Sequence, residues 1–216
     1  MSRAANAPPA HASSTVPNAC LAVFLVVWIA LGIAPRYRED WVLENLLTLV
    51  AVPAAVLTFR RFRFSDQAYV QATLFLLLHT VGSHYTYSEV PAGDWVKHLF
   101  GLSRNHYDRV VHFCFGLLML RPVRERAFRK PEAVGRAARF YLSVAAVMLW
   151  SAGYEISESI VAAVVDPAAG TAYLGTQGDV WDAQKDMGLA WIGALIGAAI
   201  DAWQCAGASS TQAPTA

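Results

Sequence analysis

The stretch ACLAVFLVVWIALGIA, residues 19–34, decides the fold class of this chain because none of its side chains is charged. A bilayer core about 30 Å thick is crossed by a helix of roughly 20 mainly apolar residues, and somewhat shorter stretches suffice where the bilayer thins. The residues are mostly Leu, Ala and Val, and they lack the strict alternation of a barrel strand. The stretch therefore predicts a transmembrane α-helix.

Five further stretches have the same character, so we expect an all-α, polytopic transmembrane bundle. The predicted spans are Asn18–Ala34, Trp41–Phe59, Gln67–His84, a short one that begins near Asn105 or Asp108 and ends at Leu120, Phe140–Val165, and Val180–Trp203. They form one predicted domain over residues 18–204. The Ala/Ser/Pro/Thr-rich segments 1–17 and 205–216 are predicted to be disordered tails. A cleaved signal peptide is the alternative for the first span, but Arg3 lies far from the apolar stretch and Pro35 follows the cleavage candidate.

The composition agrees with a membrane protein and excludes several other classes. Apolar residues make up 56% of the chain and charged residues 15%, against roughly 25% charged residues in soluble domains. A net charge of +1 argues against a nucleic-acid partner. The three cysteines form no close pair, which argues against a disulfide framework or a zinc ribbon. No phosphate-binding loop is present, so we expect no nucleotide cofactor.

Positive charge gathers on one side of the predicted topology. Of the 17 Lys and Arg residues, 11 fall in the N-terminal tail and in the two links that follow the second and fourth spans. Because cytoplasmic loops carry the excess of Lys and Arg, both termini are predicted to be cytoplasmic. The chain is therefore expected to cross its membrane several times and to begin and end on the same side.

Polar side chains gather at the opposite, outer side. The helical spacing of Asp108 with His112, Glu155 with Glu158, and Asp182 with Asp186 places each pair on one face of its helix. An ionised group inside the bilayer costs about 2.5–3.5 kcal/mol on insertion scales, so such groups usually face the bundle interior. We therefore expect one polar cavity, open to the outer surface and lined by three helices.

Clustered carboxylates repel one another unless protons, cations or a metal ion neutralise them. The residues expected to hold a divalent ion are Asp108, His112, Glu155, Glu158, Asp182 and Asp186. Carboxylates with a neutral imidazole suit Zn²⁺, Mn²⁺ or Fe²⁺, and an all-oxygen subset suits Mg²⁺. In that reading Glu155, Asp182 and His112 are the candidate catalytic residues, because a bound metal activates water while a spare carboxylate accepts a proton.

Four further polar residues are candidates for substrate binding. Arg109 and Lys185 can hold an anionic group such as a phosphate, and Gln177 and Asn105 lie in the adjoining outer loops. The competing interpretation of all these residues is a structural polar network between helices. The small-residue step formed by Gly193 and Gly197 predicts close helix packing.

Three motifs resemble a known family. NHYDRVVHFCFG (105–116), YEISES (154–159) and GTQGDVWDAQKDM (175–187) are similar to the bacterial YjdF-type inner-membrane family, and the resemblance extends from about Trp28 to Asp201. It implies a polytopic protein of the cytoplasmic membrane and carries no established activity.

A more distant similarity is to VanZ-like membrane proteins, whose pattern is an Asp-Lys-x-x-His-Phe stretch, a later Glu, and an Asp-x-x-x-Asp helix. The matching residues are Asp108, His112, Phe113, Glu155, Asp182 and Asp186, with Arg109 in place of the usual Lys. This substitution keeps the charge and changes its hydrogen-bonding geometry. The similarity implies a lipid-linked or cell-envelope substrate.

Three functions follow from these patterns. The first is a metal-dependent hydrolase or transferase that acts on, or a protein that binds, a lipid-linked envelope intermediate at the outer leaflet. The second is a non-catalytic membrane scaffold in which the polar residues join helices. The third is a small proton-coupled transporter, disfavoured because only Asp201 marks a polar path in the inner half. The patterns leave the oligomeric state open.

Overall fold

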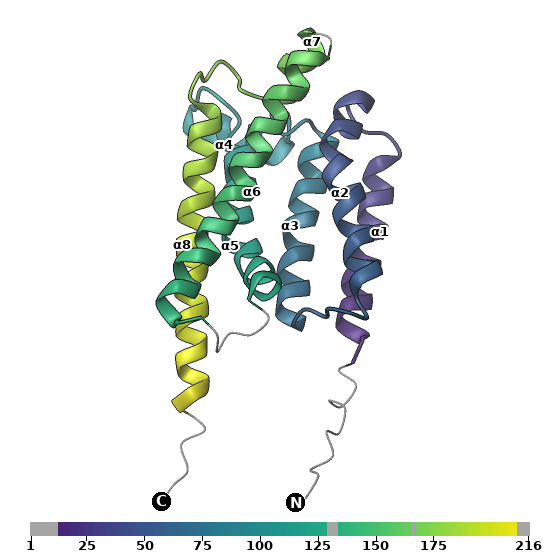
Figure 1. The fold of residues 1–216 in the computed structure, drawn as a ribbon. Coiled ribbons are helices and arrows are strands. Elements are labelled where there is room, and N and C mark those ends of the chain that lie inside the picture. Colours follow the sequence, from purple (N-terminus) through teal and green to yellow (C-terminus); the bar gives the residue numbers. More distant parts are fainter. Residues whose placement is uncertain (1–12, 129–133, 166, 211–216) are drawn as a thin grey trace, which may run out of the picture.

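The computed structural model describes residues 13–128, 134–165 and 167–210, and the regular secondary structure of these residues is all α-helix (Figure 1). The helices are α1 (Thr15–Gly32), α2 (Arg38–Thr58), α3 (Asp66–His84), α4 (Pro91–Phe100), α5 (Tyr107–Ala127), α6 (Arg136–Val164), α7 (Pro167–Leu174) and α8 (Asp182–Ser210). Each of the six long helices overlaps one of the six predicted spans. Residues 1–12 and 211–216 of the expected tails lie outside the described part, and α1 and α8 extend a few residues into the tail ranges.

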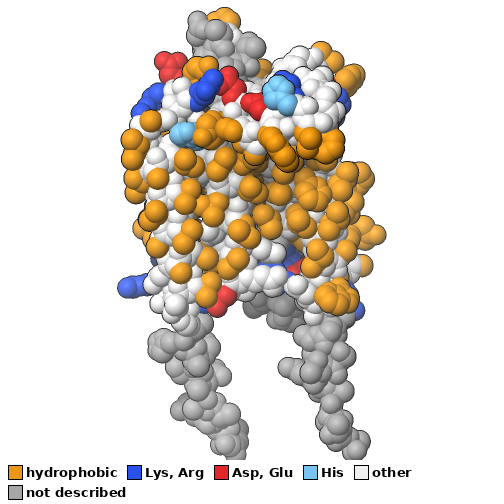
Figure 2. Space-filling model, turned by 180° about the vertical axis from the view of Figure 1, so that it is seen from behind, with side chains coloured by type: hydrophobic (Ala, Val, Ile, Leu, Met, Phe, Trp, Pro, Cys, Tyr) orange, Lys and Arg blue, Asp and Glu red, His pale blue; other side chains and the backbone are white. Residues whose placement is uncertain are grey.

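Three of the described helices are long and apolar enough to cross a membrane by length and composition: α1, α2, and α8 over Asp182–Gln204. Many apolar side chains on α1 and α2 point outward; Val26 is 68% exposed and Leu57 82% exposed. Figure 2 shows these hydrophobic side chains as a broad belt, with most Lys, Arg, Asp and Glu side chains above and below it. This pattern is typical of a protein whose surrounding solvent is lipid.

The helix that contains the fourth predicted span is longer than that span. α5 continues past Leu120 to Ala127, so Arg121, Arg124 and Arg126 belong to its last turns and not to a loop. The predicted span ends at Leu120 because hydropathy falls at the first arginine, whereas a helix continues as long as its hydrogen bonds are made.

Two short helices were also missed, and both lie in links between predicted spans. α4 begins with Pro91 in its first turn and ends at Gly101, whose φ of 60° is the left-handed conformation that glycine adopts without strain. α7 occupies the link between α6 and α8. Neither is long enough to cross a bilayer, and for this reason span-length reasoning did not find them.

α5 lies at the centre of the bundle and packs against α3, α6 and α8. The core between these helices contains Leu120, Val144, Val147, Ala194 and Ala198. The prediction of close packing is confirmed: a β-carbon added at Gly193 would overlap the carbonyl oxygen of Phe113, and one added at Gly197 would lie 2.9 Å from the carbonyl oxygen of Leu117. The backbones of α5 and α8 therefore touch directly.

The two ends of the bundle differ in chemistry. We call the end where α5 and α8 begin the polar end, defined by Asp108, Asp179, Asp182 and Asp186, and the other the basic end, defined by Arg60, Arg61, Arg63, Arg121, Arg124 and Arg126. α1 begins and α8 ends at the basic end (Figure 1). There Asp201 is ion-paired with Arg121 at 2.8 Å and with Arg124 at 2.5 Å.

Candidate functional site

Three of the predicted metal ligands come together at the polar end. α5 contributes Asp108 and His112, one turn apart, and α8 contributes Asp186. Each offers one ligand atom, and the three atoms all lie within 4.8 Å of one another. The i, i+4 spacing put Asp108 and His112 on one face of α5, and the close α5–α8 contact brings Asp186 opposite them. We call these three residues the Asp–His–Asp group.

Two carboxylate oxygens at this group lack hydrogen-bond partners. Asp186 is 2% exposed and its Oδ1 has no partner, and the same holds for Oε1 of Glu155 on α6. Glu155 Oε1 lies 3.4 Å from His112 Nε2, and Asp108 Oδ1 lies 3.5 Å from the same nitrogen. A buried carboxylate oxygen without a partner is costly, so these atoms are suited to a ligand that brings charge or a donor.

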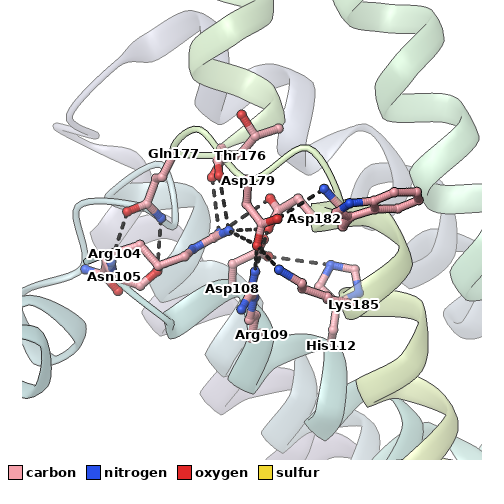
Figure 3. Close-up of polar contacts among 12 residues, drawn as sticks. Arg104, Asn105, Asp108, Arg109, His112, Thr176, Gln177, Asp179, Asp182 and Lys185 are labelled. Carbon is pink, nitrogen blue, oxygen red and sulfur yellow. Dashed lines mark hydrogen bonds and ion pairs between the residues drawn. The ribbon is translucent and has the colours of Figure 1, made fainter. Parts of the chain in front are cut away.

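Asp182 lies beside this group but is bound to arginines. Arg104 Nη1 donates to Asp182 Oδ1, and Arg109 Nη2 lies 3.3 Å from the same oxygen (Figure 3). The side chains of Arg104 and Asp182 are each 6% exposed. Asp182 therefore has its charge neutralised by protein groups, in contrast to Asp186 one turn further along α8.

Arg104 is a functional candidate that the sequence reasoning missed. Besides Asp182 it reaches the backbone carbonyls of Thr176 at 3.1 Å and Gly175 at 3.4 Å, so it ties the loop before α5 to the loop before α8. In the sequence it appeared as one of a few arginines in an outer loop. The only available signal was its position immediately before the Asn105–His112 motif.

Asp179 completes the ion-pair network at the surface. Its Oδ2 accepts from Lys185 Nζ at 2.5 Å and from Arg109, and its Oδ1 accepts from the Trp181 N–H at 3.1 Å. The hydrogen bond from Lys185, then that from the Trp181 backbone and that from Arg109, hold the pKa of Asp179 well below its usual range. Arg109 and Lys185, the predicted anion binders, thus already hold a carboxylate.

The other two predicted substrate-binding residues, Asn105 and Gln177, form hydrogen bonds with each other. Gln177 accepts from the Asn105 backbone N–H at 2.9 Å and donates to the Asn105 carbonyl at 3.0 Å. The Asn105 side chain, in a residue only 1% exposed, donates to the Val90 carbonyl and to Asp94, each at 3.0 Å. These contacts give Asn105 and Gln177 a positioning role for the loops that carry the site.

Glu158 does not join the Asp–His–Asp group. It lies half-buried near Tyr154 and Glu44. Glu44 lies within α2, is 4% exposed and accepts a hydrogen bond from Tyr154 at 2.8 Å. The ring of Tyr154 in turn lies 6.1 Å from that of His112, which places this second acidic pair next to the group.

The predicted open cavity was wrong in its form. Arg104, Asn105, Asp182 and Asp186 are all buried. Arg104 contacts Asp182, and Asn105 contacts Gln177, across the place where the cavity was expected (Figure 3). The reason is electrostatic: the sequence reasoning counted the acids, but Arg104 of the loop before α5 and Arg109 in the first turn of α5 neutralise Asp182 and Asp179. The result is a packed polar network with a few unpartnered oxygens.

The low pKa of Asp179 makes the stability of this network pH-dependent. Because the folded-state pKa lies below that of the unfolded chain, about 4, the stabilisation from Asp179 is fully present above that value and is lost as pH falls further. We expect an Asp179→Asn variant to melt below the wild type at pH 7, and the difference to shrink between about pH 4 and 3. Thermal unfolding in detergent across this pH range measures the difference in melting temperature between the two proteins. A difference that does not change with pH would contradict the ion-pair assignment.

The fold and its apolar belt define a class: this is a helical integral membrane protein with an acidic, histidine-containing group buried at one end. The chain belongs to the family described as "Predicted membrane protein (DUF2238)", which matches residues 16–206. It is similar to the "Inner membrane protein YjdF" of Escherichia coli (strain K12), with 34% identity over 178 residues that cover 82% of this chain and 85% of the relative. The resemblance to the YjdF-type family is thereby confirmed. No solved structure matches this chain.

Proposed function

We propose that the Asp–His–Asp group binds a divalent metal ion and that the metal site acts on a lipid-linked or envelope substrate. The observation that carries the proposal is the convergence of three ligand atoms within 4.8 Å, one of them from a carboxylate that is 2% exposed and has an oxygen without a partner. One imidazole nitrogen with two carboxylates suits Zn²⁺, Mn²⁺ or Fe²⁺ better than Mg²⁺.

The neighbouring residues supply the chemistry that such an ion needs. Three protein ligands leave a coordination position for water or substrate, and a bound ion lowers the pKa of water. Glu155 is the proposed general base, because its unpartnered Oε1 lies beside His112. Asp182 becomes a positioning residue through Arg104 and Arg109. An incoming phosphate or similar anion would compete with Asp179 for Arg109 and Lys185.

The proposed topology places this chemistry at the outer leaflet. It has six spans with both termini in the cytoplasm of a bacterium and the chain in the inner membrane. Support comes from α1 beginning and α8 ending at the same end, from the arginines of that basic end, and from the name of the E. coli relative. An amphiphile held in the membrane would then reach the polar end from the lipid, which agrees with the envelope substrate that the VanZ-like resemblance implies.

Metal analysis of detergent-purified protein tests the proposal. We expect near-stoichiometric metal in the wild type after purification with added Zn²⁺, Mn²⁺ and Mg²⁺ and without chelator. The Asp186→Asn variant should lose that metal while it keeps its helical circular dichroism. Asp201→Asn is the matched control, since it removes a buried carboxylate from the same helix at the basic end, and it should retain the metal.

The scaffold function is the second candidate, favoured by the mutual contacts of Arg104 with Asp182 and of Asn105 with Gln177. Absence of metal from both the wild type and Asp201→Asn under these conditions would overturn the metal site in favour of the scaffold. The transporter remains the weakest candidate, because the acid in the inner half, Asp201, is bound to Arg121 and Arg124.

A further inference from the structure

Helix α4 has its apolar and polar residues on opposite faces. On a helical wheel, Ala92, Trp95, Val96, Leu99 and Phe100 occupy one continuous arc, and Gly93, Asp94, Lys97 and His98 occupy the other. A helix of ten residues with this division is strongly amphipathic. The question is which face it turns towards the rest of the protein.

α4 turns its polar face inward. Asp94 accepts a hydrogen bond from the side chain of Asn105, and the backbone at Gly93 approaches the same side chain so closely that an added β-carbon would overlap it. The Asn105 side chain also holds the Val90 carbonyl, just before the helix. Gly93 and Asp94 of the polar arc are therefore packed on the loop that leads into α5, whereas His98 at the edge of the arc is exposed.

The apolar face of α4 points away from the protein. Trp95 is 66% exposed, Leu99 59% and Phe100 68%. The exposed side chains of Leu102 and of Val110 on α5 follow it along the chain towards the apolar belt. In water this arrangement is inverted relative to an ordinary surface helix, which buries its apolar face and exposes its polar one.

We infer that α4 lies in the membrane–water interface, with Trp95, Leu99 and Phe100 inserted among the lipid acyl chains at the polar end. The lipid surface is the occupant because this is an integral membrane protein, and exposed Leu102 and Val110 extend the apolar residues of α4 along the chain into α5. A tryptophan together with flanking Lys97 and His98 is typical of helices that lie at the headgroup level. A helix of ten residues is too short to cross.

This placement has a consequence for the polar end. Asn105 joins α4 on one side and Gln177 on the other, so α4, the start of α5 and the loop before α8 are held together. The depth of α4 in the membrane then sets the depth of the Asp–His–Asp group. The inference does not depend on whether that group binds a metal.

Spin labels along α4 test the inference in lipid nanodiscs. In a background without the native cysteines, labels are attached through Leu99→Cys on the apolar arc and His98→Cys on the polar arc. We expect the Leu99→Cys label to be severalfold more accessible to oxygen than to a water-soluble nickel chelate, and the His98→Cys label to show the reverse. Size-exclusion chromatography confirms that both variants are folded.

Other outcomes would overturn the inference. High accessibility of both labels to the nickel chelate would mean that the apolar face is in water. Low accessibility of the Leu99→Cys label to both reagents, with dipolar broadening, would mean that a second copy of the chain covers it. As an independent measurement, a Trp95→Phe variant should lose part of the fluorescence that brominated lipids quench in the wild type, since other exposed tryptophans such as Trp150 and Trp191 contribute the rest; an unchanged quenched intensity would also count against insertion.

Discussion

A Gly193→Val variant is expected to lose its folded state under conditions in which the wild type is stable. A β-carbon at this position overlaps the carbonyl oxygen of Phe113 and lies 2.9 Å from the backbone nitrogen of Leu117, so α5 and α8 have to move apart. Overpacking a core typically costs about 1–3 kcal/mol, and the cost here should reach or exceed that range because the obstacle is backbone, which has no alternative rotamer. Unfolding by SDS, followed by circular dichroism and intrinsic fluorescence, measures the change.

The same helix offers a matched control. At Gly188 an added β-carbon meets nothing within 4 Å, so Gly188→Ala should be neutral, or stabilise α8 by about 0.5–1 kcal/mol through its lower conformational freedom. The contact at Gly193 also brings Asp186 close to Asp108 and His112. Substitutions at Gly193 that weaken the contact between α5 and α8 should therefore reduce both stability and the amount of bound metal. A Gly193→Val variant with the SDS midpoint of the wild type would show that the helices do not touch in this way.

The second large effect is expected for Arg104→Met. This change removes the main cationic partner of Asp182 and leaves a carboxylate whose side chain is 6% exposed. Breaking a buried ion pair from one side typically costs about 3–5 kcal/mol, because the remaining charge is neither solvated nor paired. Arg109, at 3.3 Å from the same carboxylate, should hold the loss to the lower part of that range.

A double variant separates the buried charge from the loss of shape. Arg104→Met with Asp182→Leu removes both charges, and it should recover most of the stability lost in Arg104→Met alone, since apolar replacement of a buried pair is often neutral or favourable. Arg36→Gln is the control at an exposed ion pair, with Glu89, where the expected loss is within about 1 kcal/mol. A double variant no more stable than the single one would mean that Arg104 acts through its carbonyl contacts instead.

Much of the site was predictable where the residues lie on one helix. Asp108 and His112 are one turn apart, and a single helix is enough to bring them together. The pairing of Asp182 with Asp186 was predicted on the same basis and was only half right. Both residues lie in the first turns of α8. Asp182 is ion-paired with Arg104, whereas Asp186 faces α5 with an oxygen that has no hydrogen-bond partner.

The difference between Asp182 and Asp186 depends on the positions of residues that are distant from them in sequence. Arg104 is 78 positions from Asp182, and Tyr154 is 110 from Glu44. The periodicity of the sequence cannot predict such pairs, because they depend on which loops the helices bring together. The direction of α4 is a similar case: its wheel predicts an amphipathic helix, but only the contact with Asn105 decides which face is turned to the protein.

The sequence by itself determined that this is a helical membrane protein and where its long helices run. Hydropathy and charge act locally: each stretch of about 20 apolar residues must satisfy its own backbone hydrogen bonds in lipid, whatever its neighbours do. The tertiary structure decided which acids are neutralised and which keep an unpartnered oxygen. That choice depends on distances between side chains on different helices, which are set by the close approach of α5 and α8 at Gly116, Gly193 and Gly197.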